Sequence, residues 1–133
     1  MGKVVIYATG MTKNTKKLAE YIARGTGADI FNLKEMTRID LSGYDTVIFG
    51  TGIHAGKPYK QVVEFIGNNQ DALVGKRLHL FISCMYNDEK GDNQCQAVSE
   101  ALGINDAVYF NKKAEEMNEA GFPVAVDEYI AKL

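Results

Sequence analysis

The stretch that decides the fold is Val4-Val5-Ile6-Tyr7-Ala8-Thr9-Gly10-Met11-Thr12-Lys13-Asn14-Thr15. Its first five residues form a short, continuous apolar run, which is typical of a strand buried on both faces of a parallel sheet. The polar residues that follow open a segment in which Leu18 and Ile22 share one helical face. A strand that passes through a polar loop into a helix predicts the first unit of an α/β fold.

Four further apolar runs extend this pattern along the chain. Residues 47–49 end at Gly50-Thr51-Gly52, residues 78–82 end at Ser83-Cys84, and weaker strand signals lie at residues 29–33 and 107–110. Helical spacing predicts helices at residues 15–24, 58–66, 94–102, 114–118 and 126–133, and we expect a loop or one short helix at 33–44. Because strands and helices alternate, we predict a three-layer α-β-α sandwich around a five-stranded parallel sheet.

Composition narrows the class of protein. The 133 residues include 15 basic and 17 acidic side chains, a net charge of −2, and 46% are hydrophobic. These values are typical of one globular domain, expected to span residues 1–133, and they give no electrostatic reason to expect a nucleic-acid partner. Since no apolar run approaches the ~20 residues of a membrane helix and the start lacks a signal-peptide core, we expect a cytoplasmic protein without a membrane span.

Three loops that follow predicted strands are the candidate binding site, because ligands of open α/β sheets bind outside the carboxyl ends of the strands. The first loop contains Thr9, Gly10, Met11, Thr12, Lys13, Asn14 and Thr15. The second contains Thr51, Gly52, Ile53, His54, Ala55 and Gly56, and the third contains Ser83, Cys84, Met85 and Tyr86.

Each loop allows a binding role and a purely structural one. The first opens a helix, whose free N–H groups favour a phosphate, although Thr12 or Asn14 would also serve as a helix cap. It matches neither a Walker A loop nor a dinucleotide fingerprint. The glycines of the second loop allow close approach of the backbone or a positive φ. Tyr86 in the third is either a stacking platform or an ordinary surface tyrosine.

Metal binding and hydrolysis find no support in the sequence. The spacing of Cys84 and Cys95 matches no zinc pattern, so buried thiols are the better interpretation of both. No pairing of a nucleophile with a base is visible, and we therefore expect no catalytic residue and no metal site.

Taken together and in order, the three loops resemble the flavodoxin family. The stretch Val5-Ile6-Tyr7-Ala8-Thr9 followed by Thr12-Lys13-Asn14-Thr15 resembles the family's phosphate loop, although Lys13 stands where glycine is usual and the loop is one residue longer. Residues 47–56 resemble the third strand and the loop on one flavin face, and residues 81–86 resemble the fourth strand and the loop whose aromatic residue covers the other face.

The resemblance implies a short-chain flavodoxin-like fold with sheet order 2-1-3-4-5 and bound FMN. It places the phosphate on Thr9, Thr12, Asn14 and Thr15, with the ring between the second loop and Tyr86. The family role is low-potential one-electron transfer, so we expect separate redox partners, a reductase and an acceptor, and a monomeric carrier.

The sequence is also compatible with other functions. Within the family, the chain is alternatively a flavodoxin-like oxidoreductase, similar to protoporphyrinogen oxidase or reducing a quinone. A third interpretation is an interaction module without FMN. A two-component receiver domain would need carboxylates after the first and third strands, where this chain has Thr9 and Thr51.

Overall fold

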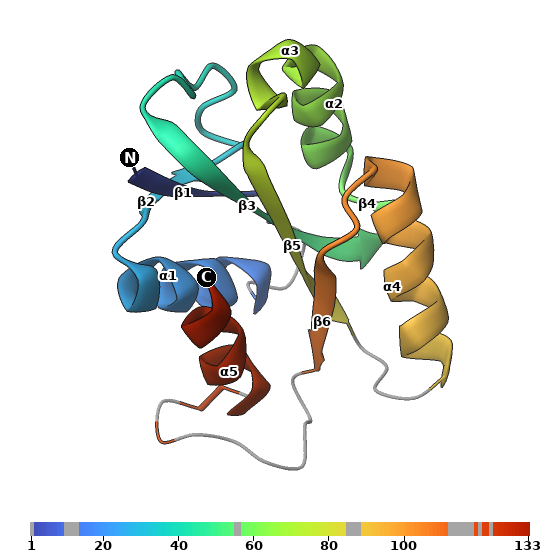
Figure 1. Ribbon diagram of the computed structural model, residues 1–133. Coiled ribbons are helices and arrows are strands. Elements are labelled where there is room, and N and C mark those ends of the chain that lie inside the picture. Colours follow the sequence, from blue (N-terminus) through green and yellow to red (C-terminus); the bar gives the residue numbers. More distant parts are fainter. Residues whose placement is uncertain are drawn as a thin grey trace.

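The computed structural model describes residues 2–9, 14–54, 57–84, 89–111, 119, 121–122 and 124–133, with only the backbone of His54, Cys84 and Asn111. Figure 1 shows the elements in chain order. They are β1 (Gly2–Tyr7), α1 (Asn14–Thr26), β2 (Asp29–Asn32), β3 (Tyr44–His54), β4 (Lys57–Pro58), α2 (Lys60–Asn68), α3 (Gln70–Leu73), β5 (Arg77–Cys84), α4 (Glu89–Leu102), β6 (Ala107–Asn111) and α5 (Val124–Lys132).

Five parallel strands form the sheet in the order β2-β1-β3-β5-β6. Counted along the parallel strands alone, this is the predicted order 2-1-3-4-5, so the fold prediction is confirmed. The additional strand β4 has two residues and pairs antiparallel with the end of β3, where His54 lies opposite Lys57. It was not predicted, because a Lys-Pro pair carries no strand signal.

Helices cover both faces of the sheet, which gives the three layers (Figure 1). On one face, α1 and α5 pack on a core that includes Ile22, Ile48 and Phe81. On the other face, α2, α3 and α4 pack on a core that includes Val47 and Leu80. Neighbouring residues of one strand thus enter opposite cores, which explains why the strand runs are apolar throughout rather than alternating.

Three predicted helix starts are wrong by two residues or more, and one of them is that of α5, which begins at Val124 rather than at residue 126. Helix α4 begins at Glu89 rather than at residue 94, and α2 begins at Lys60, since Pro58 belongs to β4. Acidic Glu89 and Asp92 in the first turn of α4 suit the positive end of the helix dipole, which stabilises this earlier start. The segment 33–43 forms turns and irregular backbone, as the loop alternative predicted, and the predicted helix at 114–118 lies outside the described residues.

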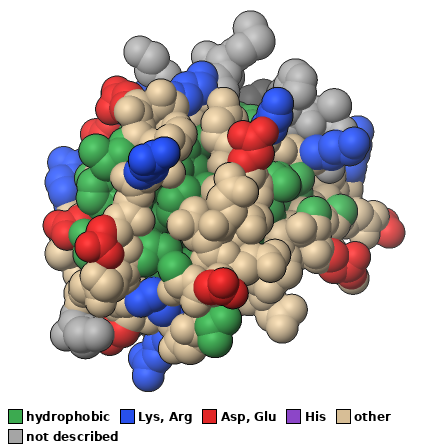
Figure 2. Space-filling model, turned by 90° about the horizontal axis from the view of Figure 1, so that it is seen from above, with side chains coloured by type: hydrophobic (Ala, Val, Ile, Leu, Met, Phe, Trp, Pro, Cys, Tyr) green, Lys and Arg blue, Asp and Glu red, His purple; other side chains and the backbone are tan. Residues whose placement is uncertain are grey.

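The surface carries both signs of charge. Viewed from above Figure 1, acidic and basic side chains are interspersed over the described part of the face rather than gathered by sign (Figure 2). This distribution agrees with the small net charge of −2. Within the described ranges, no helix has the length and apolar character that crossing a membrane requires.

Candidate functional site

The carboxyl ends of β1, β3 and β5 lie side by side, as the sequence predicted. Gly50 of β3 is in register with Tyr7 of β1 and with Phe81 of β5, and Gly52 is in register with Ser83. This end of the sheet contains the described members of the predicted site, which are Thr9, Asn14, Thr15, Thr51, Gly52, Ile53 and Ser83, with the backbone of His54 and Cys84. The other predicted members lie outside the described residues and remain predictions: Gly10, Met11, Thr12, Lys13, Ala55, Gly56, Met85 and Tyr86.

The first turn of α1 brings hydrogen-bond donors to this end of the sheet. Thr15 is buried, Asn14 is partly exposed, and the turn carries no acidic side chain. Lys16 and Lys17 are exposed on the same turn. The first four N–H groups of a helix have no partner within the helix, and the dipole gives this end a partial positive charge. The turn therefore offers neutral donors and positive potential, which together suit an anionic group.

Glycine is required at two positions near the end of β3. A Cβ atom on Gly50 would lie 2.2 Å from Cζ of Phe81, and one on Gly52 would lie 2.3 Å from the hydroxyl oxygen of Tyr59. Side chains thus lie close to the backbone at both glycines. The groups that approach are aromatic rings of the protein itself, and neither glycine has a positive φ.

Thr51 stabilises the β3–β4 hairpin through two hydrogen bonds of its hydroxyl. It is fully buried, and its hydroxyl donates to the carbonyl oxygen of Gly52 at 2.8 Å and accepts from the backbone N–H of Tyr59 at 2.9 Å. The Thr51 side chain therefore stabilises the backbone of the candidate site through hydrogen bonds within the protein. Tyr59 was missed by sequence reasoning, because a single tyrosine after Pro58 has no periodic or motif signal.

The end of β5 is tied to the neighbouring elements. Ser83 is partly exposed, and it pairs in register with Gly52 on one side and Phe110 of β6 on the other. Nearby, the hydroxyl of Tyr109 donates to Asp92 Oδ1 at 2.7 Å, which joins β6 to the first turn of α4. This contact fixes the start of α4 beside the sheet.

The last residue of β1 is a buried tyrosine, Tyr7. Tyr7 is 4% exposed and belongs to the core beneath α1 and α5. Burial raises the pKa of its hydroxyl, and the nearby carboxylates of Glu20 and Glu35 raise it further. Tyr7 therefore stays neutral at physiological pH and adds an apolar floor beneath this end of the sheet.

Known proteins share both the sequence pattern and the fold. Residues 4–121 match the flavodoxin domain family. An uncharacterized protein of Methanocaldococcus jannaschii is 30% identical over 108 residues, which cover 77% of this chain and 72% of that protein. The structure resembles a WrbA-like flavodoxin from Agrobacterium tumefaciens (TM-score 0.70, 20% identity, 98% of this chain and 93% of that one). It also resembles oxidised flavodoxin 2 from Bacillus cereus (TM-score 0.67, 20% identity, 98% and 96%). The chain belongs to the flavodoxin domain family.

Proposed function

We propose that this chain binds FMN at the carboxyl ends of β1, β3 and β5 and carries single electrons between separate redox proteins. Membership of the flavodoxin domain family supports the cofactor. The observation that carries the proposal is the start of α1, where Asn14 and Thr15 stand beside the end of β1 in a helical turn without a carboxylate.

The donor set at this turn fits the phosphate of FMN. Hydroxyl and amide side chains of Thr9, Asn14 and Thr15 are neutral hydrogen-bond donors, and the free N–H groups of the turn add more. A phosphate dianion gains from such donors and from the helix dipole without a carboxylate to repel it. Lys16 and Lys17 add positive charge at the exposed side of the same turn.

The ends of β3 and β5 would hold the ring. The hairpin of β3 and β4 is fixed by the buried hydroxyl of Thr51, and the backbone of Gly52 and the partly exposed Ser83 lie on adjacent strands. A fixed hairpin keeps backbone groups in place beside a flat ligand and excludes water from one side of it. FMN supplies the reversible uptake of electrons, while the protein sets binding and electrostatics.

The charge distribution shapes the expected partners. A strongly acidic carrier is steered to basic partners at a rate that falls with salt. This chain has a net charge of −2 and interspersed charges on the face of Figure 2. We therefore expect electron exchange with partner proteins to depend only weakly on ionic strength.

Cofactor analysis and an anaerobic redox titration test the proposal. The purified protein should be yellow, release FMN on denaturation, and show two resolved one-electron steps in a potentiometric titration. A colourless protein that takes up no added FMN would contradict the cofactor and favour the interaction module. Bound FMN that is reduced only in a single two-electron step would contradict the carrier role and favour a flavodoxin-like oxidoreductase.

A further inference from the structure

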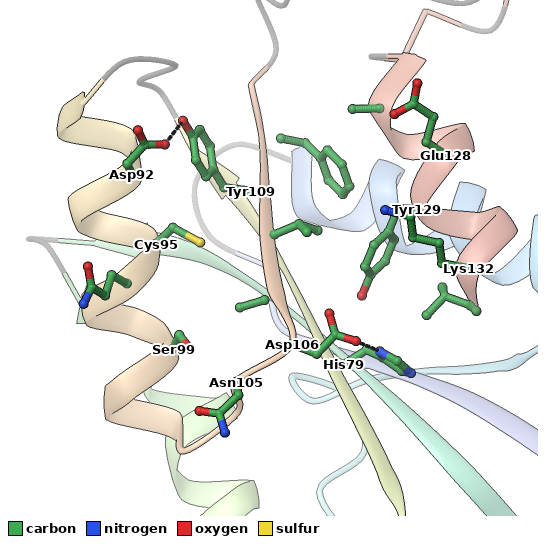
Figure 3. A pocket seen from close by; sticks show the side chains of 16 residues that line it. His79, Asp92, Cys95, Ser99, Asn105, Asp106, Tyr109, Glu128, Tyr129 and Lys132 are labelled. Atoms are coloured by element: carbon green, nitrogen blue, oxygen red, sulfur yellow. Dashed lines mark hydrogen bonds and ion pairs between the residues drawn. The ribbon is translucent and has the colours of Figure 1, made fainter.

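A groove lies along the outer side of β6, and its end near the start of this strand lies away from the proposed FMN site. It encloses about 660 Å³ and is walled by α4 on one side and α5 on the other, with residues 107–110 of β6 as its floor (Figure 3). Strand β6 is the last strand of the sheet order, so the groove opens at the sheet edge. The volume lies within the range of small-molecule sites.

The end of the groove near the start of β6 is polar. Asp106 directly precedes β6, and its Oδ2 lies 2.6 Å from Nδ1 of His79 on β5. The ring of Tyr129 on α5 points toward this pair (Figure 3). These three residues, which we call the polar end, sit near the amino ends of β5 and β6, whereas the proposed FMN site is at the carboxyl ends.

The hydroxyl of Tyr129 has no hydrogen-bond partner within the described part of the chain. The residue is 6% exposed, and its hydroxyl oxygen is buried without a hydrogen-bond partner among the residues that the structure describes. Most buried hydroxyls in proteins are paired, because an unpaired one has lost its bonds to water. Burial, and then the charge of Asp106, raise the pKa of Tyr129, so this group stays protonated and is a donor that needs an acceptor.

The polar end therefore combines a donor and an acceptor at neighbouring points. The Tyr129 hydroxyl can donate, and the carboxylate of Asp106 keeps Oδ1 for a donor while Oδ2 faces His79. A lactam edge has a C=O beside an N–H on the same side and matches this pair. A single trans peptide unit does not match it, because its C=O and N–H point in opposite directions.

The walls suit a flat ring. Val108 and Phe110 of β6 and Leu133 after α5 line the groove with apolar surface. The rings of Phe110 and Tyr129 meet edge to face, with centroids 5.6 Å apart and planes at 72°. We propose that this groove binds a planar heterocycle with a lactam edge, of the size of a pterin or pyrimidine, whose carbonyl accepts from Tyr129 and whose N–H donates to Asp106.

An NMR titration with lumazine, a bicyclic lactam, tests this site. The ¹⁵N-labelled protein is first saturated with FMN, or used as purified if it takes none, so that the outcome does not depend on the proposed cofactor. Quinoxaline, a bicyclic ring without a lactam edge, is the control probe. We expect lumazine to shift the amides of β6 and α5, and quinoxaline to bind at least tenfold more weakly.

Two variants locate the contact. Tyr129→Phe removes the unpaired hydroxyl and keeps the ring, so it should weaken lumazine binding about tenfold while raising the melting temperature of the free protein. Tyr44→Phe is the control. It removes a hydroxyl that lies away from the groove and donates to Asp29 Oδ2 at 2.6 Å, so it should leave lumazine binding unchanged. The proposal is overturned if lumazine shifts no amide of β6 or α5, if quinoxaline binds equally well, or if Tyr129→Phe binds lumazine as the parent does.

Discussion

Two buried hydroxyls at opposite ends of the sheet have opposite surroundings. Thr51, at the carboxyl end of β3, both donates and accepts within the protein, and the adjacent glycines are in contact with aromatic rings. Tyr129, near the amino end of β6, has a hydroxyl without a described partner beside an open groove. The region around Thr51 is therefore tightly packed beside the proposed FMN site, and its hydroxyl is fully hydrogen-bonded. The region around Tyr129 retains a hydroxyl that can still donate a hydrogen bond. Substitutions in the two regions should have effects of different size and sign.

The largest effect is expected at Gly50. In Gly50→Ala, the new methyl group would overlap the fully buried ring of Phe81, so the free energy of unfolding should fall by about 3 kcal/mol. Urea unfolding measures the change. Gly67→Ala in α2 is the matched control, because a Cβ there meets nothing within 4 Å and should stabilise the helix by about 0.5–1 kcal/mol. Equal losses at both glycines would show that the Phe81 contact is not the cause.

A smaller loss of stability is expected for Gly52→Ala. The Tyr59 ring that a Gly52→Ala methyl would strike is only partly buried, whereas Phe81 is fully buried, so we expect the free energy of unfolding to fall by a smaller amount, about 2 kcal/mol. The test is a double-mutant cycle with Tyr59→Ala, measured by urea unfolding. In the Tyr59→Ala background the cost of Gly52→Ala should nearly vanish. A cost that persists unchanged would mean that another neighbour excludes the methyl group.

How far the sequence alone predicts this molecule depends on the range of the interactions involved. The strand order, the two covered faces and the position of α1 follow from continuous apolar runs and helical spacing, which are local signals. The start of α4 was misplaced, because Gly91 and its polar neighbours are typical of a loop. Strand β4 exists only through pairing with β3, which a two-residue segment cannot reveal.

The predictions for the candidate site show the same difference between local and long-range interactions. The sequence correctly placed the three strand ends together, since parallel strands share one carboxyl edge. It did not show which groups approach Gly50 and Gly52, because Phe81 and Tyr59 are brought there by pairing and by chain reversal. The polar end of the groove was missed as well, because His79 and Asp106 are 27 residues apart and meet only in the folded sheet.

Of the three test substitutions in the two regions, Tyr129→Phe has the smallest expected effect on stability, and its sign is opposite to that of the other two. Tyr129→Phe should raise the free energy of unfolding by about 1 kcal/mol at neutral pH, because it removes a buried unpaired hydroxyl. The pKa of Tyr129 is higher in the folded chain than its ordinary value of 10.0, so its contribution is constant below about pH 10 and falls as the pH rises further. The parent should therefore lose more stability than the variant between about pH 8 and about pH 11.

Urea unfolding at both pH values checks this prediction. The tyrosines Tyr7 and Tyr44 also have raised pKa values and are present in both proteins, so they cancel in the comparison. If Tyr129→Phe were less stable than the unsubstituted protein at neutral pH, the Tyr129 hydroxyl would have a partner. It would then not be available to donate to a ligand in the groove.

The most direct test of the central claim compares FMN with riboflavin, which lacks the phosphate. Asn14→Asp introduces a carboxylate in the first turn of α1, where the phosphate is expected, with almost no change in shape. Asn68→Asp is the control, since it adds the same charge at the last residue of α2. Fluorescence titration of the apoprotein should show FMN binding weakened at least tenfold by Asn14→Asp alone, with riboflavin affinity unchanged in all three proteins. Equal FMN affinity in parent and Asn14→Asp would contradict the proposed phosphate site.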